Sequence, residues 1–319
     1  MAVVEVRDLQ VSYPLRGSWF GPRRRLFAVN GVSFSIEEGE TVGLVGESGC
    51  GKSTLGRALV RLLEPTAGSI QICGRDISRL RGRELRRFRR NFQMIFQDPY
   101  GSLNPRLTVF STLDEVIGLH FRLSAAERRE RAVSLLERVG LDAEALDRYP
   151  HQFSGGQRQR IGIARALAAE PRFIVADEPV SALDVSVQAS IVNLLDDIRR
   201  ESSTSFLFIA HDLAVVEHIS QRILVMYLGR VVESAPAREL VANPLHPYTR
   251  ALLSAAPTLD SAGRKRIVLS GDVPSPLAPP SGCPFHPRCP RADHRCAAEC
   301  PPEVKIAPGR LVCCFHPGE

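Results

Sequence analysis

Nine residues near the start of the chain constrain its fold more than any other feature. Gly46–Thr54 reads Gly-Glu-Ser-Gly-Cys-Gly-Lys-Ser-Thr, which matches the pattern G-x-x-x-x-G-K-[ST] at every fixed position. The apolar run 41–45 before it indicates a buried strand, and residues 55–63 after it have helical spacing. A strand, a glycine-rich loop and a helix in this order predict an α/β domain whose loop binds the phosphates of a nucleoside triphosphate.

Each residue type in this loop suits the binding of phosphate groups. Glycines at 46, 49 and 51 let the backbone curl with its N–H groups inward, and the following helix directs its positive end to the same place. Lys52 adds a charge for the outer phosphates, and Ser53 offers a hydroxyl to Mg²⁺. A glycine turn before an ordinary helix is the alternative, which the complete match in its required context disfavours. The predicted nucleotide-binding residues of the loop are Gly46, Glu47, Ser48, Gly49, Cys50, Gly51, Lys52, Ser53 and Thr54.

Composition and charge narrow the class of protein. The 319 residues suffice for one large domain with an appendage, or for two modest domains. The 41 basic and 35 acidic residues leave a net charge of +6, too small and scattered an excess to indicate nucleic-acid binding by itself. The densest basic cluster, residues 79–90, is interpreted as a solvated surface helix rather than a contact patch for nucleic acid or lipid headgroups. Neither a bilayer-spanning apolar stretch nor a secretory pattern is found, so we expect a soluble chain that stays where it is made.

Apolar patterns along the chain alternate between strand and helix periods. Strands are predicted at 2–6, 32–36, 69–73, 92–96, 173–176 and 205–210, and helices at 111–120, 125–139, 154–169 and 185–200. This alternation predicts a largely parallel sheet covered by helices, with a helical insert at about 98–160 and an exposed loop at 16–25. The predicted domains are 1–235 for the nucleotide-binding domain, 236–260 for connecting helices and 261–319 for a loop-rich, separately stapled tail.

Two acidic residues end the apolar run 173–176. Asp177 and Glu178 would project from the carboxyl edge of the sheet, where Asp177 can hold Mg²⁺ and Glu178 can polarise an attacking water. Two surface acids at a strand end are the common alternative. Because these two follow a phosphate loop in an α/β chain, we favour the functional interpretation.

Three further features gain meaning only together. Gln97 and His211 each follow a predicted strand, and each alone would be an ordinary polar loop, cap or packed residue. Phe153–Gln157 opens a helix with a serine cap and two glycines, which leaves bare N–H groups at its positive end. This is a second anion site, and one ATP cannot easily use both.

Together these motifs resemble the ABC-transporter ATPase family. The residues that carry the resemblance are Gly46–Thr54, Gln97, Phe153–Gln157, Phe173–Glu178, Ser181–Asp184 and His211, in the family's order. The combination is more specific than any one motif and spans roughly residues 2–235. It implies a P-loop ABC ATPase cassette, with a mostly parallel sheet core, an antiparallel β subdomain and a helical subdomain. Phe153 stands where leucine is usual, an apolar change that does not touch the phosphate contacts.

The resemblance implies a role for each matched residue. Tyr13 would stack on adenine, Glu178 would be the general base and His211 would hold the γ-phosphate. Gln97 would contact Mg²⁺ and the water, and would sense the membrane partner through the helical insert. The implied Mg²⁺ ligands are Ser53, Gln97 and Asp177.

A second group of matched residues would act on a neighbouring subunit. Asp184 would communicate across the dimer, and the residues implied to contact ATP held by the second subunit are Ser154, Gly155, Gly156 and Gln157. Because one chain holds one phosphate loop and one signature, it must pair with another chain. Lacking a transmembrane segment, it must also use the membrane channel of another subunit.

Three stretches resemble a narrower group, the ATPases of oligopeptide/dipeptide importers. They are residues 96–106, 243–253 and 282–290, so the resemblance covers nearly the whole chain. It implies a paralogous ATPase as partner, or a homodimer, together with two transmembrane permease subunits and an external substrate-binding protein. No nucleic-acid partner is expected. The implied location is peripheral, on the cytoplasmic face of the cell (inner) membrane.

Six of the eight cysteines lie between residues 283 and 314, which in a reducing cytosol indicates metal more than disulfides. Cys283, Cys289, Cys296 and Cys314 match positions that look like [4Fe-4S] ligands in some relatives, and four thiolates from a loop-rich tail fit that chemistry. Zinc, completed by one of the histidines at 286, 294 and 316, and no metal at all are the alternatives. The cysteines at 300 and 313 depart from the family pattern.

The sequence therefore predicts an ATP-hydrolysing subunit that powers peptide import by ATP-driven dimer closure, with ATP and Mg²⁺ as ligands. The same ATPase could serve nickel, glutathione or another small solute. A soluble ABC ATPase acting on nucleic acid or ribosomes is the alternative from another class. Such relatives usually carry two cassettes, a long coiled coil or zinc-bearing inserts within the cassette, and this sequence shows none of these features.

Overall fold

The computed structural model describes residues 2–15, 25–181, 183–255, 267, 269 and 271–318. The chain divides into two compact units. Unit 1 consists of Met1–Val4, Ile36–Glu40 and Gln71–Leu207, and unit 2 consists of Glu5–Ser35, Thr41–Ile70 and Phe208–Glu319. The loop predicted at 16–25 lies outside the described residues, apart from Arg25 at the start of a strand.

Strand β3 (Thr41–Val45) brings the chain to the predicted phosphate loop in unit 2. All five of its residues are buried, as the continuous apolar run predicts, and it pairs in parallel with β9 (Arg222–Tyr227). Helix α7 (Leu213–Ile219) packs closely on this strand, because a side chain at Gly43 would lie 2.2 Å from Val216 Cγ1. Helix α1 (Lys52–Leu59) follows the loop that leaves the carboxyl end of β3.

Further strands of unit 2 extend this sheet, and helices lie between them in the chain. The strand order is β11-β12-β10-β9-β3, and the remaining strands are β10 (Arg230–Pro236), β11 (Val304–Ala307) and β12 (Arg310–Val312). The helices of the unit after α7 are α8 (Ala237–Ala242), α9 (Pro247–Ala255), η4 (His286–Arg288) and α10 (His294–Ala298). Helices α8 and α9 both lie within residues 236–260.

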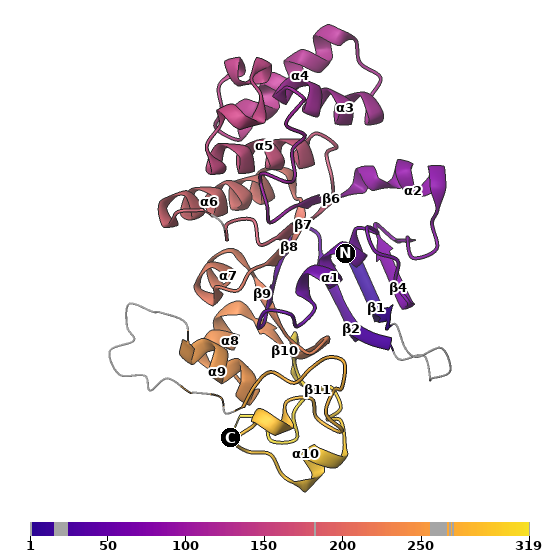
Figure 1. Cartoon of the computed structure of the whole chain (residues 1–319), viewed down its shortest axis with the longest axis vertical. Helices are drawn as coiled ribbons and strands as arrows, with labels where there is room; N and C mark the ends of the chain where they lie inside the picture. Colours follow the sequence, from indigo (N-terminus) through magenta and orange to yellow (C-terminus); the bar gives the residue numbers. More distant parts are fainter. Residues whose placement is uncertain are drawn as a thin grey trace. The chain divides into compact units, whose positions relative to one another are not determined.

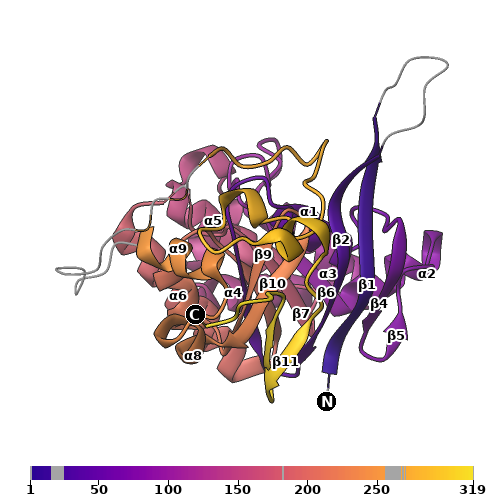
Figure 2. The same ribbon diagram turned by 90° about the horizontal axis from the view of Figure 1, so that it is seen from below.

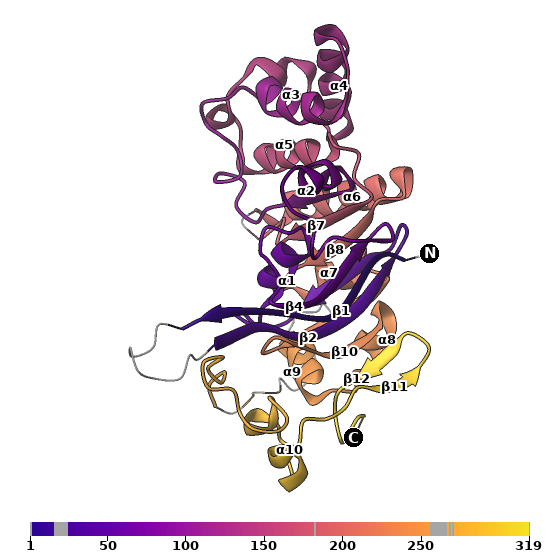
Figure 3. The ribbon, with the colours of Figure 1, turned by 90° about the vertical axis from the view of Figure 1, so that its right-hand side faces the viewer.

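Four strands in unit 2 differ from the sequence prediction. Strands β9 and β10 were not predicted, although β9 is almost wholly buried. The tail was expected to be loop-rich and separately stapled, but β12 pairs antiparallel with β10, with Val312 opposite Glu233, and β11 pairs with β12 (Figure 3). The three-residue β12 is too short to show a period, so only its hydrogen bonds to β10 reveal it.

A second sheet, most of it in unit 2, has the strand order β2-β1-β4-β5. Its strands are β1 (Ala2–Pro14), β2 (Arg25–Glu37), β4 (Ala67–Ile72) and β5 (Arg75–Asp76). Figure 2 shows β1 and β2 as long neighbouring strands, both longer than the short runs predicted from the sequence. Strands β4 and β5 pair antiparallel.

Unit 1 is built on β6 (Phe92–Ile95) and β7 (Phe173–Asp177), which pair in parallel, with β8 (Ser205–Ile209) next to β7. Because the two strands are parallel, the segments after Ile95 and after Asp177 leave the sheet at the same edge. Figure 1 shows the helices of this unit. They are α2 (Gly82–Phe88), α3 (Val109–His120), α4 (Ala125–Arg138), α5 (Gly155–Leu167) and α6 (Val185–Ser202), with short turns η1 (Arg89–Asn91), η2 (Ala143–Asp147) and η3 (Pro150–Gln152).

Local capping explains several of these helix boundaries. Ser124 and Glu127 form a capping box at the start of α4, and Thr108 accepts a hydrogen bond from the Ser111 N–H at the start of α3. Helix α2 has no buried residue, which agrees with the predicted solvated surface helix. Among the helices in the described part of the chain, none is long and apolar enough to cross a membrane.

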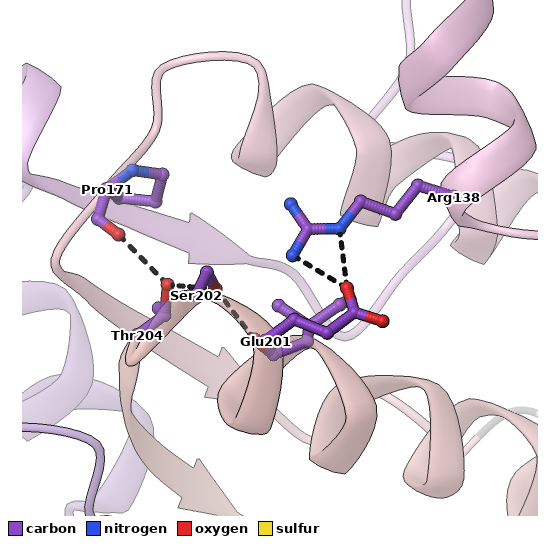
Figure 4. A network of polar contacts seen from close by, with 6 residues as sticks. Arg138, Pro171, Glu201, Ser202 and Thr204 are labelled. Atoms are coloured by element: carbon purple, nitrogen blue, oxygen red, sulfur yellow. Dashed lines mark hydrogen bonds and ion pairs between the residues drawn. The ribbon is translucent and has the colours of Figure 1, made fainter.

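A small polar network holds the end of α6 to the segments that lead into β7 and β8 (Figure 4). The buried Thr204 hydroxyl donates to the Pro171 carbonyl at 3.2 Å and lies 2.9 Å from Ser202 Oγ, which donates to the Ile198 carbonyl. Beside it, the exposed Glu201 accepts two hydrogen bonds from Arg138 of α4, at 3.2 and 3.3 Å. The buried hydroxyl and the exposed ion pair are expected to contribute unequally to stability.

Replacing Thr204 by valine keeps the side-chain shape but leaves the Pro171 carbonyl without this donor. We expect Thr204→Val to lower the free energy of unfolding by about 1–3 kcal/mol, measured by urea denaturation. Arg138→Ala, which breaks the exposed pair, should cost at most about 1 kcal/mol. An equal loss for the two variants would contradict the role assigned to the buried hydroxyl.

Candidate nucleotide-binding site

The phosphate loop lies so close to its surroundings that two of its positions accept only glycine. Gly46 and Gly51 have φ of +154° and +107°, in the region that side chains rarely adopt. A Cβ at Gly46 would lie 2.2 Å from the Met226 carbonyl oxygen, and a Cβ at Gly51 would lie 2.1 Å from the Ala28 carbonyl oxygen. The backbone of the loop is therefore packed directly against the backbone of neighbouring segments of unit 2.

Lys52 is folded back onto the loop that precedes it. Its side chain is only 6% exposed, and its ammonium donates to the carbonyl oxygens of Gly46, at 2.7 Å, and Glu47, at 3.1 Å. The first turn of α1 carries neither a capping side chain nor an acidic residue. Its N–H groups and the lysine charge together favour an anion at this end of the helix.

Two other predicted residues belong to unit 2. Tyr13 lies in β1 and is 40% exposed, so its ring is accessible. His211 is exposed and follows β8, immediately before Asp212, which caps α7 by accepting from the Ala214 N–H. Cys50 in the loop is buried, and burial raises the pKa of its thiol, which favours the protonated form.

Unit 1 brings Gln97 and Glu178 into contact. Asp177 is the buried last residue of β7, and Glu178 follows it with φ of +46°. Gln97, two residues beyond the parallel strand β6, donates from Nε2 to Glu178 Oε2 at 2.9 Å. Two motifs that are 81 residues apart in sequence are thereby joined at one edge of the sheet. The positive φ at a non-glycine residue indicates a constrained turn just after the strand.

The predicted signature forms the start of α5. The Gln157 N–H donates to Ser154 Oγ at 3.3 Å, and the Ser154 N–H donates to Gln157 Oε1 at 3.0 Å, so the two residues form a capping box. The glycines between them allow α6 to approach, because a Cβ at Gly156 would lie 2.6 Å from Val187 Cγ1. Asp184 is exposed at the N-cap position of α6. The signature and Asp184 thus lie at the starts of two packed helices.

The four predicted cluster cysteines line a single cavity in unit 2. Cys283, Cys289, Cys296 and Cys314 share it with His246, Phe285, His286 and His316. Cys300 and Cys313 line a different cavity, which also reaches Cys283. Burial raises the pKa of the Cys283 thiol to about 12. Among the described residues, the metal-binding groups that lie within 4.8 Å of one another are Asp293, Cys296 and His316.

Two residues that contact the phosphate loop were given no role from the sequence. Arg288 hydrogen-bonds the Glu47 carboxylate, and the Tyr248 hydroxyl accepts from the Glu47 N–H. They lie 241 and 201 residues from Glu47, so no local pattern could reveal either contact. Both fall within the stretches that resemble the oligopeptide group, which was the only signal available.

Comparison with known proteins gives matches along nearly all of the chain. A family model for "ABC transporter" matches residues 29–181, and one for "Oligopeptide/dipeptide transporter, C-terminal region" matches residues 232–296. The probable peptide ABC transporter ATP-binding protein y4tS of Sinorhizobium fredii is 54% identical over 315 residues, covering 98% of this chain and 89% of that protein. The oligopeptide transport ATP-binding protein AppF of Bacillus subtilis is 51% identical over 317 residues, covering 98% of this chain and 96% of that protein.

Solved structures support the same assignment. A dimeric structure of the ATP-binding cassette MJ0796, in a post-hydrolysis state bound to ADP and Pi, superposes with a TM-score of 0.66 and 32% identity. The superposition covers 74% of this chain and 99% of that chain. The predicted α/β ABC ATPase cassette is thereby confirmed. The chain belongs to the ATP-binding proteins of ABC transporters, in their oligopeptide/dipeptide group.

Proposed function

We propose that this chain is the ATP-hydrolysing subunit that powers import of di- and oligopeptides through a membrane-embedded ABC transporter. The observation that carries the proposal is the similarity to peptide transport ATP-binding proteins over 98% of the chain, including the family-specific C-terminal region. A cassette that acted on nucleic acid or ribosomes would have no reason to carry that region. The proposed cargo is taken from these relatives, because the residues described in this chain serve ATP binding and hydrolysis rather than selection of the cargo.

The phosphate loop is proposed to bind the ATP phosphates through its inward N–H groups and the ammonium of Lys52. Ser53, Gln97 and Asp177 are the residues proposed to hold Mg²⁺, which when bound would neutralise charge on the phosphate oxygens. Glu178 is proposed to accept a proton from the attacking water. Its hydrogen bond from Gln97 orients the carboxylate, which supports this role. Tyr13 and His211 are proposed to contact the adenine and the γ-phosphate.

The signature is proposed to act in a dimer. Ser154, Gly155, Gly156 and Gln157 would contact ATP bound to a second ATPase subunit, paralogous or identical, and Asp184 would transmit the closure. The start of α5 supports this, because the serine cap occupies only part of the anion-favouring helix end. Two transmembrane permease subunits and an external substrate-binding protein would complete the importer, at the cytoplasmic face of the inner membrane.

We keep the predicted domain division as part of the proposal. Residues 1–235 would form the ABC cassette with a helical insert at about 98–160, followed by connecting helices at 236–260 and a cysteine-rich extension at 261–319. One family model matches residues 29–181 and the other matches residues 232–296, which supports a domain boundary near residue 235.

Glu178→Gln tests the catalytic assignment. An amide cannot accept the proton, so kcat for ATP hydrolysis should fall by about 10²- to 10⁴-fold, while the affinity for ATP is retained. A matched control is Glu201→Gln, which neutralises an exposed carboxylate elsewhere in unit 1. Phosphate release and equilibrium ATP binding are measured for both. Wild-type hydrolysis by Glu178→Gln would overturn the assignment of the base.

Co-purification tests the transport assignment. Tagged Glu178→Gln protein, which should remain in its ATP-bound closed form, is recovered with ATP from detergent-solubilised native membranes. We expect a sibling ATPase and two multi-span proteins to accompany it, and their identity narrows the cargo among peptides, nickel, glutathione or another small solute. Recovery of ribosomes or DNA without a membrane protein would contradict the transport proposal.

The cysteine-rich tail is proposed to hold a [4Fe-4S] cluster through Cys283, Cys289, Cys296 and Cys314. The donor set fits, because these thiols line one cavity and cluster ligands are cysteine thiolates. Zinc is the alternative, because Asp293, Cys296 and His316 lie within 4.8 Å of one another and offer it a mixed ligand set. A cluster would stabilise a tail that has little apolar core.

Metal analysis of anaerobically purified protein tests this proposal. We expect iron and acid-labile sulfide in the wild type, loss of both in Cys289→Ser, and retention in Cys300→Ser, whose exposed cysteine lies outside the four-cysteine cavity. Zinc without sulfide would instead indicate a mononuclear site, with Asp293, Cys296 and His316 as the candidate ligands. Protein without any metal would also contradict the cluster.

A further inference from the structure

The part of the chain that follows β10, named the C-terminal region, makes direct contact with the phosphate loop within unit 2. Arg288 donates from Nη1 to Glu47 Oε2 at 2.7 Å and from Nη2 to Glu47 Oε1 at 3.1 Å. The arginine side chain is only 8% exposed and that of the glutamate 26%, so water screens this pair poorly. The two parallel bonds of a planar guanidinium to a carboxylate also fix the orientation of the Glu47 side chain.

Tyr248 holds the same residue through its backbone. The Glu47 N–H donates to Tyr248 Oη at 2.7 Å, so side chain and main chain of Glu47 are both held by residues of the C-terminal region. Burial raises the pKa of Tyr248 well above its usual value, so the hydroxyl remains neutral. Two independent contacts on one loop residue distinguish this arrangement from a chance surface ion pair.

The contact residues are themselves rigidly placed. The rings of Tyr227, Tyr248 and Phe285 pack edge-on or tilted, with centroids 4.7–5.5 Å apart. The buried carboxylate of Glu233 accepts the N–H groups of Leu245 and His246 at 2.8 and 2.9 Å, which ties the start of α9 to β10. These interactions fix the position of Tyr248 in α9. They also fix Phe285, which directly precedes η4, the turn that ends at Arg288.

Glu47 is also connected to the phosphate-binding lysine. Its carbonyl oxygen accepts from Lys52 Nζ at 3.1 Å and from the Cys50 N–H at 3.2 Å. The Glu47 contacts therefore lie at one end of a short chain of bonds whose other end is the ammonium proposed to bind the outer phosphates. A displacement of Glu47 would move a partner of Lys52 and alter the curl of the loop.

We propose that Arg288 and Tyr248 are positioning residues that hold the phosphate loop in its ATP-binding conformation. The proposal deepens the ATPase function and rests on ATP binding by this loop. Neither residue needs to touch ATP. They keep Glu47, and through it the loop backbone, in the curled form, so that less ordering remains to be done when ATP binds. The C-terminal region thereby becomes part of the nucleotide site as well as a feature of this transporter group.

Coupling between ATP binding and the contacts of Glu47 with the C-terminal region acts in both directions. If the C-terminal region favours ATP binding, bound ATP must stabilise the contact by the same factor. The turn that carries Arg288 lies between Cys283 and Cys289, so ATP is expected to slow opening of this part of the tail. This effect appears in the protein's backbone and does not depend on hydrolysis.

ATP affinity of three variants tests the proposal in the full-length protein. Arg288→Gln should weaken equilibrium ATP binding by about tenfold or more, the range for hydrogen bonds to charged groups, and raise KM more than it lowers kcat. Arg288→Lys, which keeps the charge but not the paired geometry, should recover only part of the affinity. Arg295→Gln, which removes an exposed arginine paired with Glu299 in the same tail, is the matched control and should bind ATP like the wild type.

A double-mutant cycle separates this role from general damage to the tail. Glu47→Gln should weaken ATP binding as Arg288→Gln does, and the double variant should be little worse than either, because both remove one interaction. Additive losses would overturn the proposal. Tyr248→Phe removes only the hydroxyl and keeps the ring packing, so it remains informative even if Arg288→Gln folds poorly. Wild-type affinity in Tyr248→Phe and Glu47→Gln would likewise overturn it.

Hydrogen–deuterium exchange tests the reciprocal effect. Addition of ATP should slow exchange at the amides around residues 283–289 in the wild type, and this protection should be lost in Arg288→Gln. Exchange there that is unaffected by ATP in the wild type would contradict the coupling. A wild-type protein that binds no ATP would instead overturn the proposed function itself, so the two failures are distinguishable.

Discussion

Close packing of backbone against backbone at the phosphate loop is the constraint on which the rest of the structure depends. Gly46 and Gly51 each face a carbonyl oxygen at a distance that no Cβ could tolerate, at Met226 and Ala28. The loop can curl inward only because these positions have no side chain, and Lys52 then closes the curl by donating to the Gly46 and Glu47 carbonyls. The anion-favouring end of α1 follows from this arrangement.

In unit 1, the candidate site residues lie where the chain leaves the ends of two parallel strands. Strands β6 and β7 run in parallel, so the chain leaves both at one edge, and Gln97 reaches Glu178 across that edge. The signature uses another device, because α5 begins with a capping box and two glycines that let α6 approach. Polar groups are thus presented by strand ends and helix starts, whose positions are set by buried apolar packing behind them.

The C-terminal region changes how the cassette can be understood. Its strand β12 adds to β10, its aromatic residues pack with Tyr227 of β9, and its Arg288 and Tyr248 hold Glu47 of the loop. This region is part of unit 2, where a sheet pairing, an aromatic cluster and a bidentate ion pair connect it to the strands and the phosphate loop. Cys283 and Cys289 flank the turn that carries Arg288, so the proposed cluster would stabilise this turn.

The sequence by itself determined the phosphate loop, the buried strand before it, the acidic end of β7, the capped start of α5 and the membership of the ABC ATPases. These features are encoded locally, in glycine positions, apolar periods and capping residues that act over a few residues. Only the tertiary structure decided that β10 pairs with β12, that Gln97 meets Glu178, and that Arg288 and Tyr248 meet Glu47. The side-chain contacts among these join residues 81, 201 and 241 positions apart, and such pairings depend on how packed elements meet rather than on any pattern within one stretch of chain.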